Sequence, residues 1–365
     1  MGGTFARAVP VSGMTVFTRA AGLLLAGLVG CAQVPQPTPA PLPSGACSAA
    51  SAQAVEAIGL TLVPVLPEGR PGELAGARVT APRAWRLPAS WGETTPANAG
   101  LVTQLLAVQD GDRLWLIGSG PTPRLGAALA CALEQASGLR VTDVVNTRAH
   151  PELAMGNLAF DGARLWALGD VADAMARQCP QCVERLSGRL GGSGPDVDSL
   201  AGDVIRVPGH RLGQDGATQG RLGPFDWLAL PLDTGVRTLV LRHRALNLVV
   251  AQGLVWVGGV PSLRGARLAQ LQPSLAALQA FSGEARVLGE QGGLGDAQSI
   301  ADQRRYWQQL HQAVARQVNR GGLEPLPADL AELQAYRTLP GHAEHHGLNL
   351  QRAQRELEDT LFDRP

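Results

Sequence analysis

The sequence contains no lysine and few aromatic residues. Arginine therefore supplies all of the basic charge, and 31 arginines balance 31 aspartates and glutamates, so the formal net charge is +0 at pH 7. The charges are dispersed along the 365 residues, and aromatic residues make up only 4% of the chain, with 2 tyrosines and 6 phenylalanines beside 7 tryptophans. Because nucleic-acid binding needs a basic surface or a stacking platform, we exclude nucleic acid as a partner.

The sequence also lacks a hydrophobic run that is long enough to span a bilayer near its N-terminus. The apolar run at residues 20–29 is about half the length that a transmembrane helix needs. Arg7 and Arg19 precede this run and Gly30-Cys31 follows it, which is the arrangement of a secretory signal peptide. Residues 28–31, Leu-Val-Gly-Cys, resemble the bacterial lipobox, in which the cysteine thiol carries a diacylglycerol.

This resemblance implies a lipoprotein that is cleaved before Cys31. We expect residues 1–30 to be a lipoprotein signal peptide and residues 31–46 to be an extended tether, because proline recurs there at alternate positions. The mature protein is then expected in the periplasm, anchored to a membrane through lipid at Cys31. Ala32 follows the cysteine, which favours the outer membrane over the inner one.

Four further cysteines, at positions 47, 131, 179 and 182, allow three disulfide pairings. We expect a bond between Cys179 and Cys182, with Cys47 and Cys131 either joining the tether to the core or remaining apart. The spacing Cys-Pro-Gln-Cys is also that of redox-active pairs. Redox chemistry is less favoured here, because such pairs open a helix, whereas this motif ends a predicted helical run at residues 171–178.

The rest of the chain alternates between strand-like and helix-like segments, as in an α/β protein. We predict strands at residues 54–66, 77–87, 102–108 and 114–117, a helix at 125–136, and a hairpin from the strands 239–241 and 248–250. His243 falls at the turn of this hairpin and is expected on the surface. His342, His345 and His346 are interpreted as a polar loop ahead of the last helix, although three imidazoles so close together are also able to capture a metal adventitiously.

The most informative motif follows the buried strand predicted at residues 141–145. It runs from residue 146 to residue 157 and reads Asn-Thr-Arg-Ala-His-Pro-Glu-Leu-Ala-Met-Gly-Asn. The loop sits at a strand's carboxyl end, where α/β folds place their sites. It resembles the metallo-β-lactamase superfamily, and within it the zinc hydrolases of bacterial quinoprotein relay systems, whose loop reads Asn-Thr-His-x-His-Pro-Asp-His-x-x-Gly-Asn.

Later segments extend the resemblance in the same order along the chain. Residues 232–241 are similar to the family's His-Thr-x-x-Asp-Leu-Val-Val segment, with Thr234 at the histidine position. Residues 251–264 are similar to its Ala-Gly-Asp-Leu-Val-Phe segment, with Gly253 at the aspartate position. Residues 287–292 resemble its Pro-Gly-His-Gly turn, with Glu290 at the histidine position.

The resemblance implies a four-layer αβ/βα sandwich with closing helices. We expect a metallo-β-lactamase-like domain at residues 47–298 and a helical extension at 299–365, with helices near 329–336 and 350–361.

The same positions argue against a catalytic zinc, which needs about three ligand atoms and an open position for water. Arg148 has no lone pair to donate, Leu153 has no ligand atom, and Glu152 is one methylene longer than the family's aspartate. His150 is the one imidazole left in the motif. We therefore expect no zinc or other cofactor and no catalytic residue, with Arg148, His150, Glu152, Leu153, Thr234, Gly253 and Glu290 as a vestigial site.

Two arrangements of this vestigial site are possible. In one, the Arg148 guanidinium fills part of the vacated metal space and pairs with Glu152 or Glu290. In the other, a single metal is held by His150, Glu152 and Glu290, against which the charge of Arg148 argues.

The functional prediction is an exported lipoprotein that serves as a non-catalytic binding or accessory protein. The family resemblance implies a periplasmic quinoprotein system, with a quinoprotein dehydrogenase or an active zinc-bearing paralogue as partner. A metal-dependent hydrolase with an altered single-metal site is the alternative, and a purely structural use of the fold is a third possibility.

Overall fold

The computed structural model describes residues 47–65, 83–202, 204–319 and 330–362. All of them belong to one compact unit, Thr38–Pro365. The expected signal peptide, the lipid at Cys31 and the tether lie outside the described residues. No helix in the part of the chain that is described is long and apolar enough to cross a membrane.

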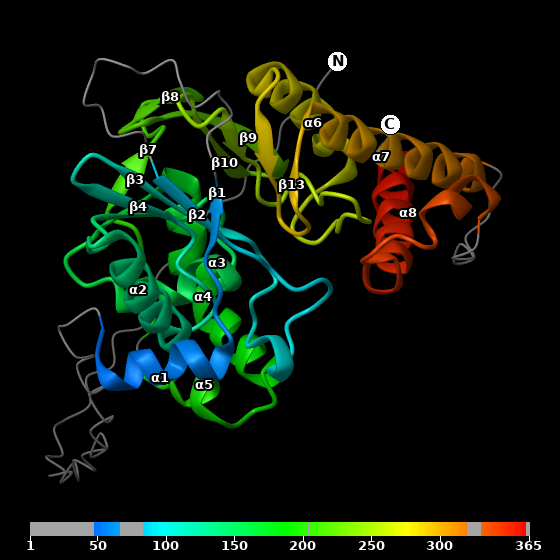
Figure 1. Ribbon diagram of the computed structural model, residues 1–365. Helices are drawn as coiled ribbons and strands as arrows, with labels where there is room; N and C mark the ends of the chain where they lie inside the picture. The colour runs from blue at the N-terminus through cyan, green and yellow to red at the C-terminus, as the bar shows by residue number, and fades with distance from the viewer. Residues whose placement is uncertain (1–46, 66–82, 203, 320–329, 363–365) are drawn as a thin grey trace, which may run out of the picture. The chain divides into compact units, whose positions relative to one another are not determined.

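The described strands form two sheets (Figure 1). One has seven strands in the order of the sequence: β1 (Val63–Val65), β2 (Arg83–Leu87), β3 (Leu105–Asp110), β4 (Arg113–Ile117), β5 (Asp143–Val145), β6 (Arg164–Leu168) and β7 (His210–Leu212). The other has six strands, which are in order from one edge β13 (Leu294–Gly295), β12 (Arg286–Leu288), β11 (Leu248–Val250), β10 (Val236–His243), β9 (Phe225–Asp233) and β8 (Gln219–Leu222).

The pairing within the first sheet positions the site. Strands β1 to β4 are antiparallel to their neighbours, whereas β4, β5, β6 and β7 run parallel. The loops after β4 and β5 therefore leave the same edge of the sheet side by side, and the amide of Gly118 donates to the Val145 carbonyl over 2.9 Å. The motif that begins at Asn146 lies at this edge, as predicted.

Successive side chains of a strand point to opposite faces of its sheet, and the buried ones pack into three hydrophobic cores. On β10, Leu239 and Leu241 point into the core between the two sheets, while Val240 points to the opposite face. On β4, Trp115 and Ile117 share the inter-sheet core. Its neighbour Leu116 packs on the outer side, in the core that also holds residues of α2 (Pro123–Ser137).

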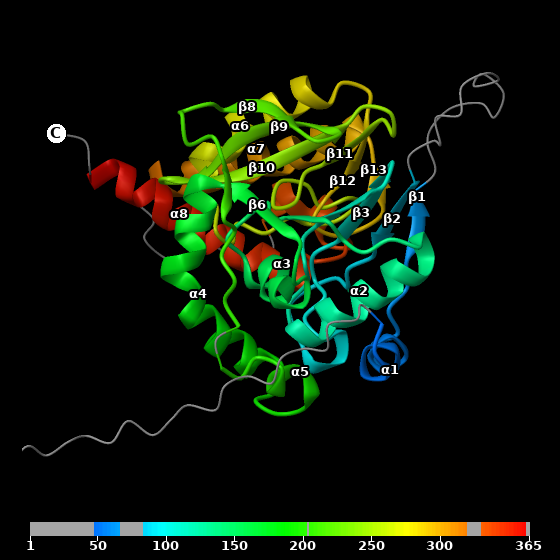
Figure 2. The same ribbon diagram turned by 90° about the vertical axis from the view of Figure 1, so that its left-hand side faces the viewer.

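Helices cover the outer faces of both sheets, so the layers follow one another as helix, sheet, sheet, helix (Figure 2). On the first sheet α2 is joined by α1 (Ala49–Ile58), and on the second sheet lie α6 (Leu268–Ser282) and α7 (Ala297–Asn319). The short helices α3 (Pro151–Ala154) and α5 (Pro195–Asp198) and the long α4 (Gly169–Arg189) connect strands near the site. The predicted αβ/βα sandwich is confirmed.

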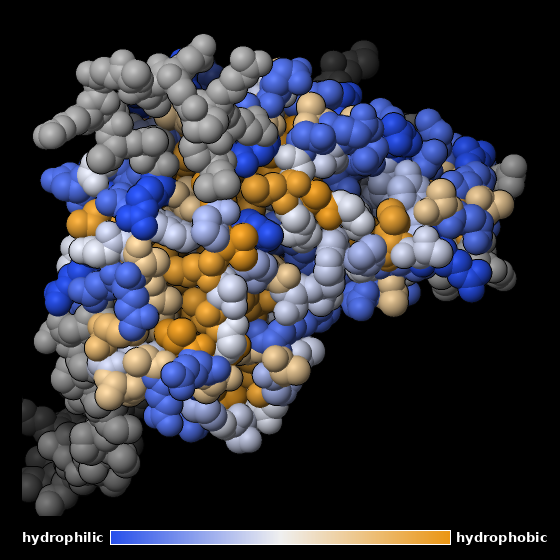
Figure 3. Space-filling model, viewed as in Figure 1, coloured by the Kyte–Doolittle hydropathy of each residue, from blue (hydrophilic) through white to orange (hydrophobic). Residues whose placement is uncertain are grey.

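The C-terminal helices extend the outer layer of the second sheet. They comprise α7, a 3₁₀ helix at Ala331–Tyr336, a π-helical turn at His342–His346, and α8 (Gly347–Phe362). Glu356 of α8 accepts hydrogen bonds from the first two amides of α6, Leu268 and Ala269, at 2.7 and 2.9 Å, which caps that helix. The surface along α7 is predominantly hydrophilic (Figure 3), because its apolar side faces the sheet.

Two predictions about the N-terminal and hairpin segments were wrong. Of the strand predicted at residues 54–66, residues 54–58 belong to α1 instead and Val63–Val65 form β1. Ser48 caps α1 through the amide of Ser51, and Gly59, at φ 65°, ends it. His243 is buried instead of exposed: its Nδ1 accepts from the amide of Leu246, and its ring packs edge-on against Phe225. Burial lowers the pKa of His243.

The expected bond between Cys179 and Cys182 is also wrong. Helix α4 continues through the motif to Arg189, and both thiols are free and buried. The disulfide joins Cys47, just ahead of α1, to Cys131 of α2. Packing of α1 on α2 brings that pair together, whereas the continuous α4 holds its two thiols on one face without a bond.

Candidate functional site

The loop from residue 146 to residue 157 is closed by its first and last residues. Asn146 and Asn157 exchange side-chain hydrogen bonds of 3.2 and 2.7 Å, and Asn146 also donates to the Leu153 carbonyl at 2.9 Å. A Cβ on Gly156 would lie 2.0 Å from the Ser119 carbonyl oxygen, so only glycine allows the loop to pack there. Asn146, Gly156 and Asn157 therefore hold the backbone of the loop, from which Arg148, His150 and Glu152 line the site.

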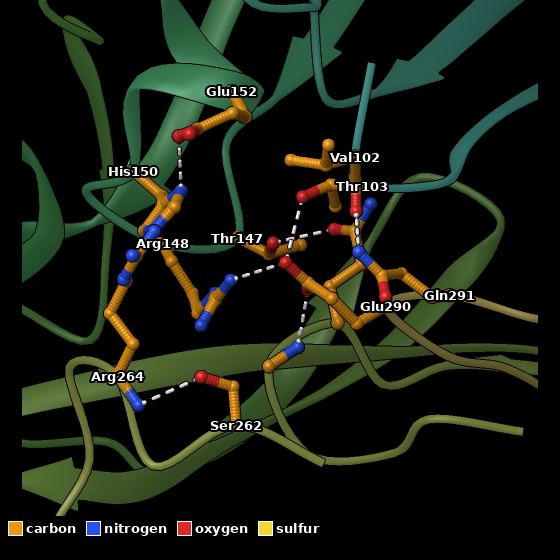
Figure 4. A network of polar contacts seen from close by, with 12 residues as sticks. Val102, Thr103, Thr147, Arg148, His150, Glu152, Ser262, Arg264, Glu290 and Gln291 are labelled. Atoms are coloured by element: carbon orange, nitrogen blue, oxygen red, sulfur yellow. Dashed lines mark hydrogen bonds and ion pairs between the residues drawn. The ribbon is translucent and has the colours of Figure 1, made fainter. Parts of the chain in front are cut away.

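Arg148 is the centre of the site. Its side chain is buried and its Nη2 donates to Oε1 of Glu290 over 2.8 Å (Figure 4). An ideal Cβ on Gly253, which has φ +79°, would lie 2.4 Å from Nη1 and 2.6 Å from Cζ of Arg148. The guanidinium thus fills the space that a side chain at position 253 would occupy.

The Glu290 carboxylate is held from three sides. Besides Arg148, Oε1 accepts from the Thr103 hydroxyl at 2.7 Å and Oε2 accepts from the amide of Gly253 at 2.8 Å. Relative exposures of 9% for the Arg148 side chain and 7% for that of Glu290 show that both charges are largely removed from water. The three hydrogen bonds satisfy the acceptor oxygens of the Glu290 carboxylate, and the negative charge of Glu290 compensates the positive charge of Arg148.

His150 and Glu152 form a second pair beside the first. Nδ1 of His150 lies 2.6 Å from Oε2 of Glu152, and the Thr94 hydroxyl donates to Oε1 at 3.0 Å. Arg189 at the end of α4 approaches Oε1 at 3.8 Å. Burial alone would raise the pKa of Glu152, but the charge of His150 and the hydrogen bonds to the carboxylate lower it to about 2.

Arg148 therefore pairs with Glu290 and not with Glu152. The hypothesis that its guanidinium replaces the metal charge is supported by this geometry, in the form that names Glu290.

Leu153 and Thr234 do not line the site. The Leu153 side chain is fully buried in the core under α2, where it packs near Gly118, and only its carbonyl serves the loop. Thr234 is exposed in the turn between β9 and β10, because Asp233 pairs with Val236 and leaves Thr234 outside the ladder. The assignment of Thr234 to the vestigial site is wrong.

A second group of polar residues supports the loop from behind, and apart from Thr147 these residues lie outside the motif. The hydroxyl of Thr147 donates to Oε1 of Gln252 at 2.6 Å, and the Gln252 amide group donates to the Gln104 carbonyl at 2.5 Å. Thr238 of β10 donates to the Gln252 carbonyl at 3.3 Å. Single polar residues inside or directly beside apolar strands were the available signal, but their partners are far away in the sequence.

The site opens into a small pocket of about 40 Å³. Its walls come from loops beside the strands of both sheets, from α3 and from the C-terminal turn. The lining residues are Gly92, Glu93, Val102, Arg148, His150, Glu152, Trp256, Ser262, Arg264, Glu290, Gln291 and His345. Apart from the ion-paired His150 Nδ1 and Glu152 Oε2, three buried polar atoms of this lining have no hydrogen-bond partner among the described residues: Arg148 Nε, Trp256 Nε1 and Gln291 Oε1.

His345 comes from the segment that was interpreted as a polar loop. Its ring is buried and Nδ1 donates to the Val260 carbonyl at 2.9 Å, while the neighbouring His346 is buried against the Tyr306 hydroxyl. The interpretation as a polar loop was wrong, because the segment is a π-helical turn in which His345 and His346 are buried by packing that local sequence does not reveal.

The residues of the pocket do not suit a zinc ion. Within the described ranges, no group of three histidine, cysteine, aspartate or glutamate side chains is placed to hold a metal. Glu290 is engaged by a guanidinium and His150 by Glu152, so His150, Glu152 and Glu290 do not converge on one point. The arrangement with a single relocated metal has no support in this geometry.

The fold is that of the metallo-β-lactamases. Solved structures that match include a metallo-β-lactamase from Hirschia baltica, at 12% identity and a TM-score of 0.50, over 67% of this chain and 96% of that one. TMB-1 matches at 12% identity and 0.50, over 68% and 97%. The mono-zinc form of the metallo-β-lactamase FIM-1 from Pseudomonas aeruginosa has 16% identity and 0.49, over 68% and 95%.

No family model matches the sequence, and no curated protein sequence matches it either. At such low identities, the likeness to the solved structures concerns the fold alone.

Proposed function

We propose that this chain is an exported lipoprotein in which the metallo-β-lactamase fold acts as a non-catalytic binding or accessory module. The observation that carries the proposal is the placement of the Arg148 guanidinium beside Gly253, in a buried ion pair with Glu290. A permanent cation at the centre of the site repels a metal ion and has no lone pair to bind one. Hydrolysis by a metal-bound water then has no support at this position.

The pocket supports a binding role. Binding sites commonly present a few convergent polar groups in a concave, partly apolar surface. Here Arg148 Nε and Trp256 Nε1 are donors and Gln291 Oε1 is an acceptor, and each is buried without a partner in the described part of the chain. The small volume restricts an occupant to a few atoms, such as one polar group of a larger ligand or partner.

The cellular location and the partners of this module are proposed from the sequence. The lipobox-like segment that ends at Cys31 supports a membrane-anchored periplasmic protein, most simply at the outer membrane because Ala32 follows the cysteine. The order of family-like segments supports a place in a quinoprotein system, beside a quinoprotein dehydrogenase or an active zinc-bearing paralogue.

A turnover assay tests the non-catalytic assignment. The full mature chain is incubated with chromogenic ester, thioester and β-lactam substrates, with and without a metal chelator. We expect hydrolysis no faster than in buffer alone. Turnover that the chelator abolishes, and that the substitution Glu290→Gln reduces, would instead establish the alternative of a metal-dependent hydrolase.

Fractionation tests the anchor separately. The wild-type protein is expected in the membrane fraction, and Cys31→Ser is expected to remain uncleaved and unlipidated. A wild-type chain that is fully soluble in the periplasm would contradict lipidation and leave the account of the pocket untouched.

A further inference from the structure

Cys179 and Cys182 lie three residues apart in α4, on the same face of the helix. Both are free, in a chain that already contains the disulfide Cys47–Cys131. Cys179 is 1% exposed and belongs to the core between the sheets, and Cys182 is 5% exposed. Both thiols are therefore buried, and Cys179 is the more deeply buried of the two.

The polar neighbours of the two sulfurs also differ. Nη2 of Arg185 donates to the Cys182 sulfur over 3.5 Å, whereas Cys179 lies one helical turn away on the core side. The neighbouring Cys179 thiol, together with Arg185 and the charge of His150, lowers the pKa of Cys182 against an opposing effect of burial. The neighbouring Cys182 thiol and burial both raise the pKa of Cys179.

We infer that Cys179 and Cys182 form a redox-active dithiol that exchanges with disulfides, in which Cys182 is the attacking sulfur and Cys179 the resolving one. The inference stands on two free thiols three residues apart on one helical face, the Arg185 guanidinium beside Cys182, and the deeper burial of Cys179. It is independent of the role proposed for the pocket.

The reaction is a two-electron exchange. The Cys182 thiolate attacks one sulfur of a disulfide RSSR, forms a mixed disulfide and releases RS⁻. Cys179 then loses its proton to the released thiolate and attacks the Cys182 sulfur, which expels the second RS⁻. The protein dithiol is oxidised to a Cys179–Cys182 disulfide, and RSSR is reduced to two thiols.

Helical geometry permits the product. Residues three apart in an α-helix have Cα atoms about 5 Å apart, within the range that a disulfide spans. In many dithiol proteins the helix N-terminus stabilises the attacking thiolate. Here the motif lies inside α4, and the Cys179 thiol and Arg185 provide that stabilisation instead.

The inference is tested by equilibrating the full mature chain in mixtures of reduced and oxidised glutathione, followed by acid quenching, alkylation and peptide mass mapping. We expect Cys179 and Cys182 to lose two hydrogens together as the fraction of oxidised glutathione rises. The Cys47–Cys131 peptide serves as an internal reference, since it reports the structural disulfide in the same sample.

Alkylation kinetics of the reduced pair identify the attacking sulfur. At neutral pH, Cys182 should react with iodoacetamide at least ~10-fold faster than Cys179, because thiolate fraction and access set the rate. Arg185→Gln should slow Cys182 several-fold, and the distant exposed Arg305→Gln should not. Two thiols that stay reduced at every glutathione ratio would overturn the inference, as would equal reactivity of Cys179 and Cys182 in the folded wild type.

Discussion

The guanidinium of Arg148 lies in the space that a side chain at Gly253 would need, with Nη1 2.4 Å from the ideal Cβ position. The two residues are thus a matched pair: the large cation is accommodated because the facing residue has no side chain. The backbone amide of Gly253 also donates to the same Glu290 carboxylate that Arg148 binds. One carboxylate therefore connects both residues.

Substitution of Gly253 by alanine should destabilise the protein by about 2–4 kcal/mol, as the sum of overpacking against Arg148 and strain at positive φ. Urea denaturation measures this change. Gly258 is the matched control, because it has φ +76° with nothing within 4 Å of its Cβ position. Gly258→Ala should cost about 1 kcal/mol from strain alone. Equal costs at the two positions would contradict the close approach of Arg148.

Removal of one partner of the Arg148–Glu290 pair should be costly. Arg148→Met leaves a buried carboxylate without its cation, which typically costs about 3–5 kcal/mol, and the bonds from Thr103 and Gly253 place this site at the lower end. The double variant Arg148→Met, Glu290→Gln should be more stable than the sum of the single effects predicts, by at least ~1 kcal/mol.

An exposed ion pair provides the comparison for that cycle. Arg305 and Asp302 are 58% and 51% exposed and lie 3.0 Å apart. Arg305→Met should change stability by less than about 0.5 kcal/mol. Additive effects of Arg148→Met and Glu290→Gln, or a cost no larger than that of Arg305→Met, would show that the buried pair is not formed.

Glu152 should make the fold sensitive to strong acid. Its pKa is lowered from 4.5 to about 2 in the folded protein, so the unfolded chain takes up a proton first as the pH falls. The stabilisation is complete above pH 4.5 and is lost between pH 4.5 and 2, and it amounts to at most about 3 kcal/mol. Glu152→Gln should flatten the stability profile in that window. An unchanged profile would contradict the buried pair with His150.

His346 should act in a different pH window. Burial, together with the neighbouring His342, lowers its pKa from 6.5 to about 4, so the unfolded chain binds the proton more readily. Stability should therefore fall as the pH drops from 6.5 to 4. His346→Gln, which keeps an acceptor for the Tyr306 hydroxyl, should remove this part of the decline in a denaturation series. A persistent decline would assign it to other groups.

Local patterns predicted the frame of the protein well. The strands that became β4, β5, β10 and β11, and the helix α2, follow from periodicity and from glycine and proline at their ends. The ordered series of family-like segments added the two-sheet sandwich. The helix at residues 49–58 was not predicted, because alternating small apolar residues also fit a strand. The Ser48 cap and the packing on α2 decide for the helix, and periodicity alone does not reveal them.

The site was predictable only in part, and the reason lies in long-range contacts. Arg148 and Glu290 were recognised as site positions, but the choice of Glu290 over Glu152 depends on Thr103 and Gly253, which lie in the loops before β3 and after β11. Thr234 was misplaced because a short turn shifts the register of β9 and β10. The contribution of His345 depends on a C-terminal turn that folds back onto Val260.

The zinc content of the mature chain tests the central claim most directly. The protein is purified without a histidine tag, equilibrated with micromolar zinc, freed of unbound metal and analysed by mass spectrometry of the element, beside the variant His150→Gln. With Arg148 bound to Glu290 in the place of a metal, wild type and variant should both retain only trace zinc. Close to one zinc per wild-type chain, lost in His150→Gln, would contradict the account and make this a metal site.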